Sequence, residues 1–178
     1  YNIHEGKWDR ELLRLFSIPE SMMPEVKNSN DIFGTMAVTS LAAHHTPLAG
    51  VLGDSQAALF GQQCTEPGMT KVTYGTGSSI MRNIGALPYT SRQGLVTSIG
   101  WQMDGAPTYV AEGNINCSGA AIKWMVDDLE LIPDSKCTEA LASSVSDNEG
   151  VYLVPAFVGL GAPYWDSDAR AALVGMTR

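Results

Sequence analysis

The sequence has little charge, few basic residues and no long apolar run. Only 17% of its 178 residues are charged, and 19 acidic residues outnumber the 11 Lys and Arg residues. No run of basic residues stands out, so nucleic acid is not an expected partner. No apolar stretch approaches the roughly 18 residues that a transmembrane helix needs, so no membrane partner is expected either.

The chain is also poor in cysteine. Cys64, Cys117 and Cys137 include no CxxC pair, and their odd number does not indicate a disulfide framework. Free thiols are typical of a reducing compartment, so we expect a cytoplasmic protein. Residues 1–6 resemble neither a signal peptide nor a start with an initiator methionine, so we expect a segment of a longer protein.

What the chain does have is enough apolar residues for a sizeable core. Hydrophobic residues make up 44% of it, which excludes a disordered chain. Apolar periodicity predicts helices over residues 7–18 and 117–130. A segment rich in Ala and Gln predicts a helix over residues 54–63, and a further short helix is predicted at residues 137–145. Strands are predicted at residues 48–52, 71–74, 78–83, 95–102, 108–111, 150–155 and 171–176. This order indicates an α/β or α+β chain, with a composition break near residues 46–54.

The first candidate for chemistry is Asp54, at the junction of a predicted strand and a predicted helix. Ligands bind beyond the carboxyl ends of strands in open α/β sheets, and a carboxylate there can accept a proton from an attacking hydroxyl. Asp is equally a preferred N-cap residue, and the pattern leaves both roles open.

The second candidate is the Gly75-Thr76-Gly77 turn between two strand-like runs. Glycines allow backbone N–H groups to approach a ligand closely, and hydroxyls add donors, so such a turn can hold a phosphate. A tight turn with no ligand is the alternative.

The third candidate combines Glu112-Gly113-Asn114 with the small residues from Ser118 to Ala121 and with Lys123. Small residues at a helix start allow a nucleotide to lie against the backbone. Close packing of helix on sheet through Gly119 and Ala120 explains the same residues. Lys123 is either a ligand or a solvated helix residue.

Two other features carry weaker signals. His44 and His45 are adjacent, and adjacent residues on a strand point to opposite faces, so we expect no metal site there. The loop from Gly159 to Asp166 either lines a cleft or contributes packing aromatics.

Several of these motifs occur together and in order. They are residues 53–62 (GDSQAALFGQ), 71–77 (KVTYGTG), 112–113 (EG), 119–124 (GAAIKW), 154–157 (VPAF), 159–165 (GLGAPYW) and 168–170 (DAR). In combination they resemble the FGGY family of carbohydrate kinases, most closely its glycerol-kinase branch, over essentially the whole chain.

This resemblance implies a ribonuclease H-like, actin-like fold, of which the chain holds a part. Residues 1–46 would be the end of the N-terminal FGGY domain, and residues 47–178 the first part of the C-terminal domain. The implied activity is ATP-dependent phosphorylation of a sugar or polyol such as glycerol or xylulose, with ATP and Mg²⁺ as cofactors. The resemblance is compatible with a homo-oligomer.

The resemblance also assigns roles to residues. It implies that Asp54 is the catalytic base, that Gly75, Thr76 and Gly77 hold the ATP phosphates, and that Gly119 contacts the nucleotide. Members of the glycerol-kinase branch carry Gln after the catalytic Asp and Phe two residues past the GTG turn, both against the substrate. Here these positions are Ser55 and Ser79, which predicts a larger and more polar substrate than glycerol.

One further departure concerns Lys123, which stands where the family has a Gln that contacts the nucleotide, and a Lys could meet a phosphate as a point charge. The metal ligands and the adenine segment are expected outside this chain, so the chain alone is expected to be inactive. The alternative function is a non-catalytic actin-like domain that binds sugar or nucleotide, or regulates.

Overall fold

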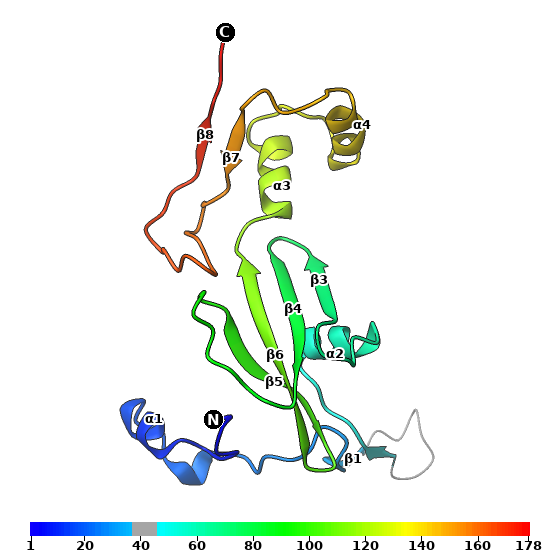
Figure 1. The fold of residues 1–178 in the computed structure, drawn as a ribbon, viewed down its shortest axis with the longest axis vertical. Helices are drawn as coiled ribbons and strands as arrows, with labels where there is room; N and C mark the ends of the chain where they lie inside the picture. The colour runs from blue at the N-terminus through cyan, green and yellow to red at the C-terminus, as the bar shows by residue number, and fades with distance from the viewer. Residues whose placement is uncertain (37–45) are drawn as a thin grey trace. The chain divides into compact units, whose positions relative to one another are not determined.

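The computed structural model describes residues 1–36 and 46–178 as a mixed α/β chain, as the sequence predicts (Figure 1). The α-helices are α1 (Arg10–Leu15), α2 (Asp54–Gly61), α3 (Gly119–Asp127) and α4 (Thr138–Ser143). The 3₁₀ turns are η1 (Glu20–Met22) and η2 (Ser135–Cys137). The strands are β1 (Gly34–Thr35), β2 (Pro47–Leu48), β3 (Thr70–Tyr74), β4 (Ser78–Gly85), β5 (Val96–Met103), β6 (Ala106–Ile115), β7 (Tyr152–Val154) and β8 (Ala172–Val174).

The largest sheet has four strands in the order β3-β4-β6-β5. Strands β3 and β4 are joined by residues 75–77, and β5 and β6 by Asp104-Gly105. Connections this short join only antiparallel neighbours. The Asp104-Gly105 turn has positive φ at both residues, 51° and 81°, which is the hairpin geometry that an Asp-Gly pair predicts.

Two short antiparallel ladders complete the strand pairing among the described residues. In one, β1 pairs with β2 through Gly34↔Leu48 and Thr35↔Pro47. In the other, β7 pairs with β8 through Tyr152↔Val174, Leu153↔Leu173 and Val154↔Ala172.

The chain divides into two compact units, and the division passes through β3, β4 and β6. Unit 1 comprises residues 1–71, 81–90 and 96–111. Unit 2 comprises residues 72–80, 91–95 and 112–178.

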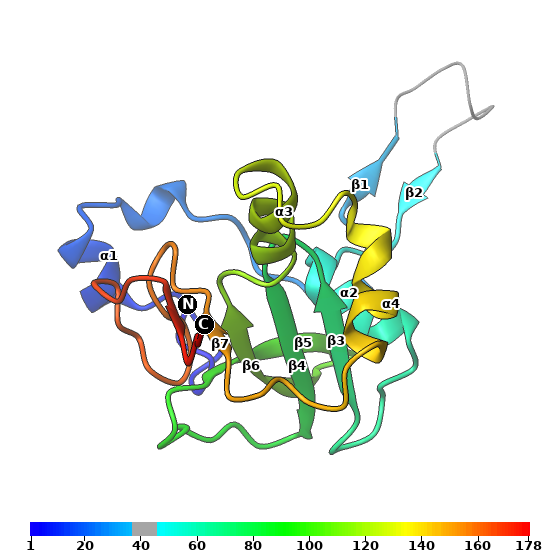
Figure 2. The same cartoon turned by 90° about the horizontal axis from the view of Figure 1, so that it is seen from above.

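The core of unit 1 forms where α2 packs beside the sheet strands of that unit (Figure 2). Leu59 on α2 is fully buried, together with Met81 and Val110 from the sheet. Phe60 adds an edge-to-face contact with Trp101, at 5.2 Å between ring centroids. Burial of side chains of this size stabilises the unit by about 1.5–3 kcal/mol each.

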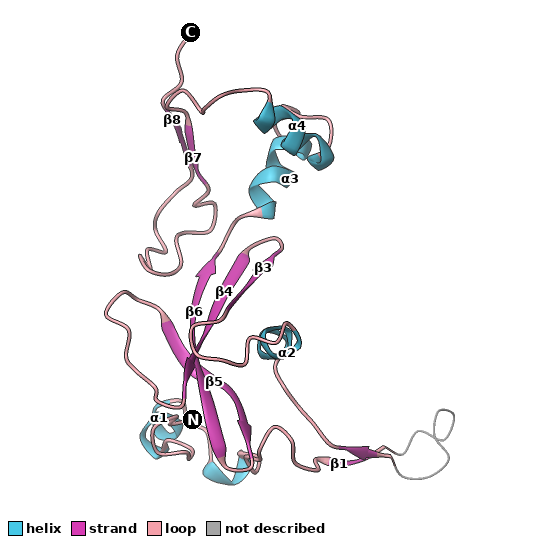
Figure 3. Cartoon of the chain, turned by 45° about the vertical axis from the view of Figure 1, so that its right-hand side comes forward, coloured by secondary structure: helices cyan, strands magenta, loops and turns pink. Residues whose placement is uncertain are grey.

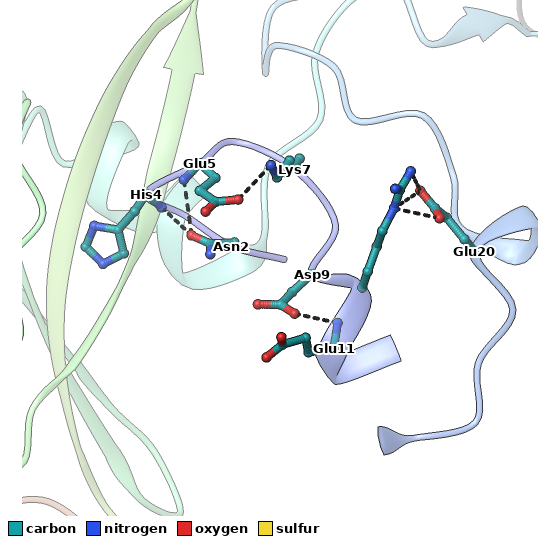
Figure 4. A network of polar contacts seen from close by, with 8 residues as sticks. Asn2, His4, Glu5, Lys7, Asp9, Glu11 and Glu20 are labelled. Atoms are coloured by element: carbon teal, nitrogen blue, oxygen red, sulfur yellow. Dashed lines mark hydrogen bonds and ion pairs between the residues drawn. The ribbon is translucent and has the colours of Figure 1, made fainter. Parts of the chain in front are cut away.

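Polar contacts organise the N-terminal segment of unit 1 (Figure 4). The Asp9 carboxylate accepts hydrogen bonds from the N–H groups of Glu11 and Leu12 and so caps α1. Arg10 forms an ion pair with Glu20, at 3.0 Å, which ties the start of α1 to η1. The pair is exposed to solvent, so it contributes little to stability.

In unit 2 the C-terminal loops pack around the end of β6 and the helix that follows it. Trp124 on α3 packs against Phe157, with 4.9 Å between ring centroids. The Asn116 side chain donates to the Gly159 carbonyl at 3.4 Å, and the Trp165 indole N–H donates to the Gly94 carbonyl at 2.6 Å. Tyr164 stays largely exposed, so its role is not core packing.

Some predicted elements are wrong in extent. The N-terminal helix is shorter than residues 7–18, because Asp9 caps it at Arg10. The buried strand predicted at residues 48–52 is absent: only Pro47–Leu48 is a strand, and Leu48 and Val51 are exposed. An apolar run fixes neither burial nor strand pairing, which depend on the partners that the fold supplies. No helix in the described part of the chain combines the length and apolarity needed to cross a bilayer.

Candidate functional site

Asp54 is the first residue of α2, and its side chain is exposed. The N-cap residue of α2 is Gly53, which has no side chain with which to cap the helix. The prediction that Asp54 is the N-cap is therefore wrong. The Asp54 Oδ1 atom accepts a hydrogen bond from the N–H of Ser55 at 2.6 Å. Within residues 1–36 and 46–178, the Asp54 carboxylate makes this one hydrogen bond, through Oδ1, so its Oδ2 atom is available to a ligand.

The GTG turn, which joins β3 and β4, lies beside the start of α3 (Figure 3). Its carbonyl groups hold the start of that helix. The Gly75 carbonyl accepts from the N–H of Gly119 at 3.0 Å and from the Ser118 hydroxyl at 3.2 Å. The Thr76 carbonyl accepts from the N–H groups of Ser118 at 2.9 Å and of Ala120 at 3.0 Å. These donors are the ones that a helix N-terminus would otherwise offer to an anion. These N–H groups at the start of α3 are therefore not available to a ligand, and a phosphate at this junction would have to be held by the turn itself.

Sterics explain two glycines of this junction. A Cβ at Gly119 would lie 2.5 Å from the Gly75 carbonyl oxygen, and one at Gly77 would lie 2.5 Å from the Ile115 carbonyl oxygen. Neither Gly75 nor Gly77 has positive φ. The close packing proposed for Gly119 is confirmed, and Gly77 is required by the end of β6.

A cavity of about 400 Å³ lies between the turn and the exposed face of α3. It is lined by Gly75, Thr76, Gly119, Ala120, Lys123, Trp124, Asp127 and Asp128. Its volume falls in the range of small-molecule sites. The structure thus brings together four of the residues expected to contact a nucleotide, namely Gly75, Thr76, Gly119 and Lys123.

Lys123 does not project alone into this cavity. Its ammonium group forms a hydrogen bond and ion pair with the Asp127 carboxylate, one turn further along α3. The hydrogen bond to Asp127, and then the charges of Asp127 and Asp128, raise the pKa of Lys123 above its ordinary value of 10.5. Sequence reasoning missed Asp127, although the i,i+4 spacing of Lys and Asp could have indicated it.

Ser79, on β4, is half-buried and donates its hydroxyl proton to Oε1 of Glu112 at 2.7 Å. Glu112 lies on β6, the neighbouring strand in the sheet. Both residues belong to unit 2, whereas Asp54 and Ser55 belong to unit 1. Ser55 is half-buried, and its backbone N–H donates to the Asp54 carboxylate.

No group of three or more His, Cys, Asp or Glu side chains in residues 1–36 and 46–178 is arranged to hold a metal ion. The adjacent pair His44 and His45 lies outside the described residues.

The chain matches models of two domains that belong to one protein family. Residues 1–61 match the N-terminal domain of the FGGY family of carbohydrate kinases, and residues 70–178 match its C-terminal domain. The chain belongs to the FGGY family of carbohydrate kinases. The expected domain boundary between residues 46 and 47 stays a prediction.

Curated relatives in this family are named glycerol kinase. The chain is 52% identical to that of Oceanobacillus iheyensis and 54% identical to that of Shewanella amazonensis, over all of this chain and 36% of each relative. The chain therefore spans about a third of the length of these relatives.

A solved structure confirms the fold. The crystal structure of Plasmodium falciparum glycerol kinase with ADP matches with a TM-score of 0.85 and 35% identity, over 96% of this chain and 34% of that one. The ribonuclease H-like, actin-like fold of this FGGY chain, predicted from its sequence, is confirmed.

Proposed function

We propose that the whole protein, of which this chain is one part, is an ATP-dependent kinase that phosphorylates a hydroxyl group of a sugar or polyol. The family, the relatives named glycerol kinase and the ADP named in the matching Plasmodium structure all support this reaction. The single observation that supports nucleotide binding by this chain is the cavity at the GTG turn, which Thr76, Gly119 and Lys123 line together.

In this proposal the cavity receives the nucleotide. Thr76 is exposed on the turn and offers a hydroxyl to a phosphate oxygen, and Gly119 lets α3 approach without a side chain in the way. Lys123 supplies positive charge, which phosphoryl groups require in phosphoryl transfer. Gly75 and Gly77 hold the turn in the shape that presents Thr76.

Asp54 acts as the general base toward the acceptor hydroxyl. It is exposed, and its Oδ1 atom is fixed by the Ser55 N–H, which leaves Oδ2 to accept the proton of the attacking hydroxyl. Ser55 and Ser79 contact the substrate in this proposal. Mg²⁺ would neutralise the phosphate charges when bound, and we assign it no ligand in this chain.

The proposal also covers the setting of the enzyme. It is cytoplasmic, takes a small sugar or polyol together with ATP, and has no nucleic-acid partner. The three cysteines are free, which suits a reducing compartment. The proposal allows the whole protein to assemble as a homo-oligomer.

The test is a phosphorylation screen of sugars and polyols with the whole protein, followed by Asp54→Asn. Asn keeps the size and can still accept the Ser55 hydrogen bond, but it cannot take a proton. We expect kcat to fall by about 10²- to 10⁴-fold while nucleotide affinity stays unchanged.

Asp147→Asn is the matched control. Asp147 is exposed and accepts only from the N–H of Glu149 among the described contacts, a bond that Asn preserves. It should retain full activity. Near-normal turnover by the Asp54→Asn protein would remove Asp54 as the base. The absence of any phosphorylated product in the screen would instead support the non-catalytic alternative.

A further inference from the structure

The hydrogen bond between Ser79 and Glu112 decides whether these two side chains can donate or only accept hydrogen bonds with a further partner. An ionised carboxylate only accepts hydrogen bonds, so the shared proton is the serine hydroxyl proton. A hydroxyl has a single proton, which means that Ser79 has only lone pairs left for another partner. The pair therefore presents acceptor atoms and one negative charge.

Both residues are half-buried and thus partly exposed to solvent. They lie on the adjacent strands β4 and β6, in the parts of these strands that belong to unit 2. The family resemblance places Ser79 against the acceptor substrate, while Glu112 has no assigned role. Ser79 is too small to shield Glu112 from a substrate, whereas the Phe that the glycerol-kinase branch carries at the position of Ser79 is large enough to do so.

We infer that Glu112 determines the charge class of the acceptor: it selects neutral polyols and ketoses and rejects sugar acids. This inference rests on the proposed function and on the place of Ser79 in the acceptor site. A polyol hydroxyl donates to the Glu112 carboxylate or to the Ser79 lone pairs. A substrate carboxylate has no proton to donate and meets a like charge, so it leaves the acceptors unpaired.

A purely structural role is the competing explanation. A hydrogen bond between two adjacent strands stabilises the sheet whatever the enzyme phosphorylates. The two explanations differ in one measurable quantity, the ratio of kcat/KM for a neutral substrate to kcat/KM for its acid. A structural tether changes both rates together, whereas a specificity residue changes the ratio.

The experiment uses the whole protein and two matched pairs of compounds, glycerol with glycerate and ribitol with ribonate. Each acid is assayed as a substrate and as a competitive inhibitor, so that weak binding is measured even without turnover. We expect the wild-type protein to prefer the neutral member by at least about 10-fold, because a lost hydrogen bond to a charged group alone accounts for about 10- to 100-fold and like-charge repulsion adds to it.

The decisive variant is Glu112→Gln. Its amide oxygen still accepts the Ser79 proton, so the contact between the strands remains, but the charge is gone and an N–H donor replaces it. We expect the neutral-to-acid ratio to fall by about 10- to 100-fold, with the KM for ATP within about twofold of wild type. Ser79→Ala keeps the charge and should leave the preference for neutral substrates in place. Glu139→Gln, at an exposed position of α4, controls for the loss of one acidic charge.

The outcomes separate the inference from the proposed function. A wild-type protein that phosphorylates acids as well as neutral compounds overturns the inference without any variant. A Glu112→Gln ratio within about twofold of wild type also overturns it and leaves the pair as a tether between strands. If the wild-type protein phosphorylates no sugar, polyol or sugar acid, the proposed function itself fails, and the inference fails with it.

Discussion

The ammonium group of Lys123 is ion-paired with the carboxylate of Asp127, one helical turn away on the face of α3 that lines the cavity beside the GTG turn. The side chains of both residues are well exposed, 76% for Lys123 and 46% for Asp127. Exposed pairs of this kind contribute little to stability. In the proposed function, Asp127 competes with an incoming phosphate for the same ammonium group.

The first prediction concerns pH. The pair raises the pKa of Lys123, so its stabilising contribution is fully present below 10.5 and is lost only as the pH rises through the raised pKa. Lys123 therefore stays charged from about pH 6 to about pH 9, and the difference in Tm between wild type and Lys123→Met should stay constant over that range. Thermal denaturation at several pH values measures it. A difference that varies within this window would contradict the pairing.

The second prediction follows from the competition. Asp127→Asn removes the carboxylate that holds Lys123, so we expect the whole protein to bind ATP about two- to fivefold more tightly at low salt. The gain should disappear at about 1 M salt, where exposed charges are screened. Calorimetric titration with ATP at both salt concentrations tests this.

Asp147→Asn, with the same change of charge on an exposed residue outside the cavity, is the control and should leave ATP affinity unchanged. Weaker ATP binding by Asp127→Asn would mean that Asp127 contacts the nucleotide itself rather than restraining Lys123.

The third prediction separates the two parts of the GTG turn. Thr76→Val keeps the volume and removes the exposed hydroxyl, so it should weaken ATP binding by about 5- to 10-fold, the worth of one hydrogen bond, with no change in Tm. Gly77→Ala should instead destabilise the protein by about 1–3 kcal/mol, because its Cβ meets the end of β6 at 2.5 Å.

Gly75→Ala is the matched control for the added methyl group. A Cβ at Gly75 meets nothing closer than the Gly77 carbonyl oxygen at 3.5 Å, an ordinary contact. Calorimetry with ATP and with the acceptor substrate, together with thermal denaturation, distinguishes these effects. Equal loss of affinity for both ligands in Thr76→Val would count against a phosphate role.

These residues also show how far the sequence alone reaches. The Asp104-Gly105 hairpin and the helix after Gly53 were predictable, because turn chemistry and the helix propensity of an Ala- and Gln-rich segment act locally. The use of Gly77 was not, because its neighbour is the Ile115 carbonyl on another strand. The Ser79–Glu112 bond likewise depends on β6 lying beside β4, a non-local pairing that no spacing in the sequence encodes.

The site shows the same division. Thr76, Gly119 and Lys123 were expected near one ligand from the resemblance, and the cavity brings them together. That the turn carbonyls consume the donors at the start of α3 was not foreseeable, since it requires the register between the turn and the helix. Local patterns thus indicate candidate residues, while long-range packing decides which of their atoms remain free for a ligand.

The last prediction concerns the size of the acceptor. By resemblance, Ser55 and Ser79 stand where the glycerol-kinase branch carries Gln and Phe, and the absence of the Phe removes an apolar wall worth about 1–3 kcal/mol against a carbon chain. Because the Ser79 proton is already given to Glu112, the space left by Phe is lined by acceptors that a longer polyol can satisfy with its own hydroxyls. We therefore expect the whole protein to prefer a sugar or polyol of more than three carbons over glycerol.

Values of kcat/KM for glycerol, a tetritol, D-xylulose and L-ribulose under one set of conditions measure this preference. The double variant Ser55→Gln, Ser79→Phe should raise the efficiency with glycerol by about tenfold relative to the longer substrates. Glycerol as the clear best substrate of the wild-type protein would refute the prediction, and the double variant would then change the efficiency with glycerol little.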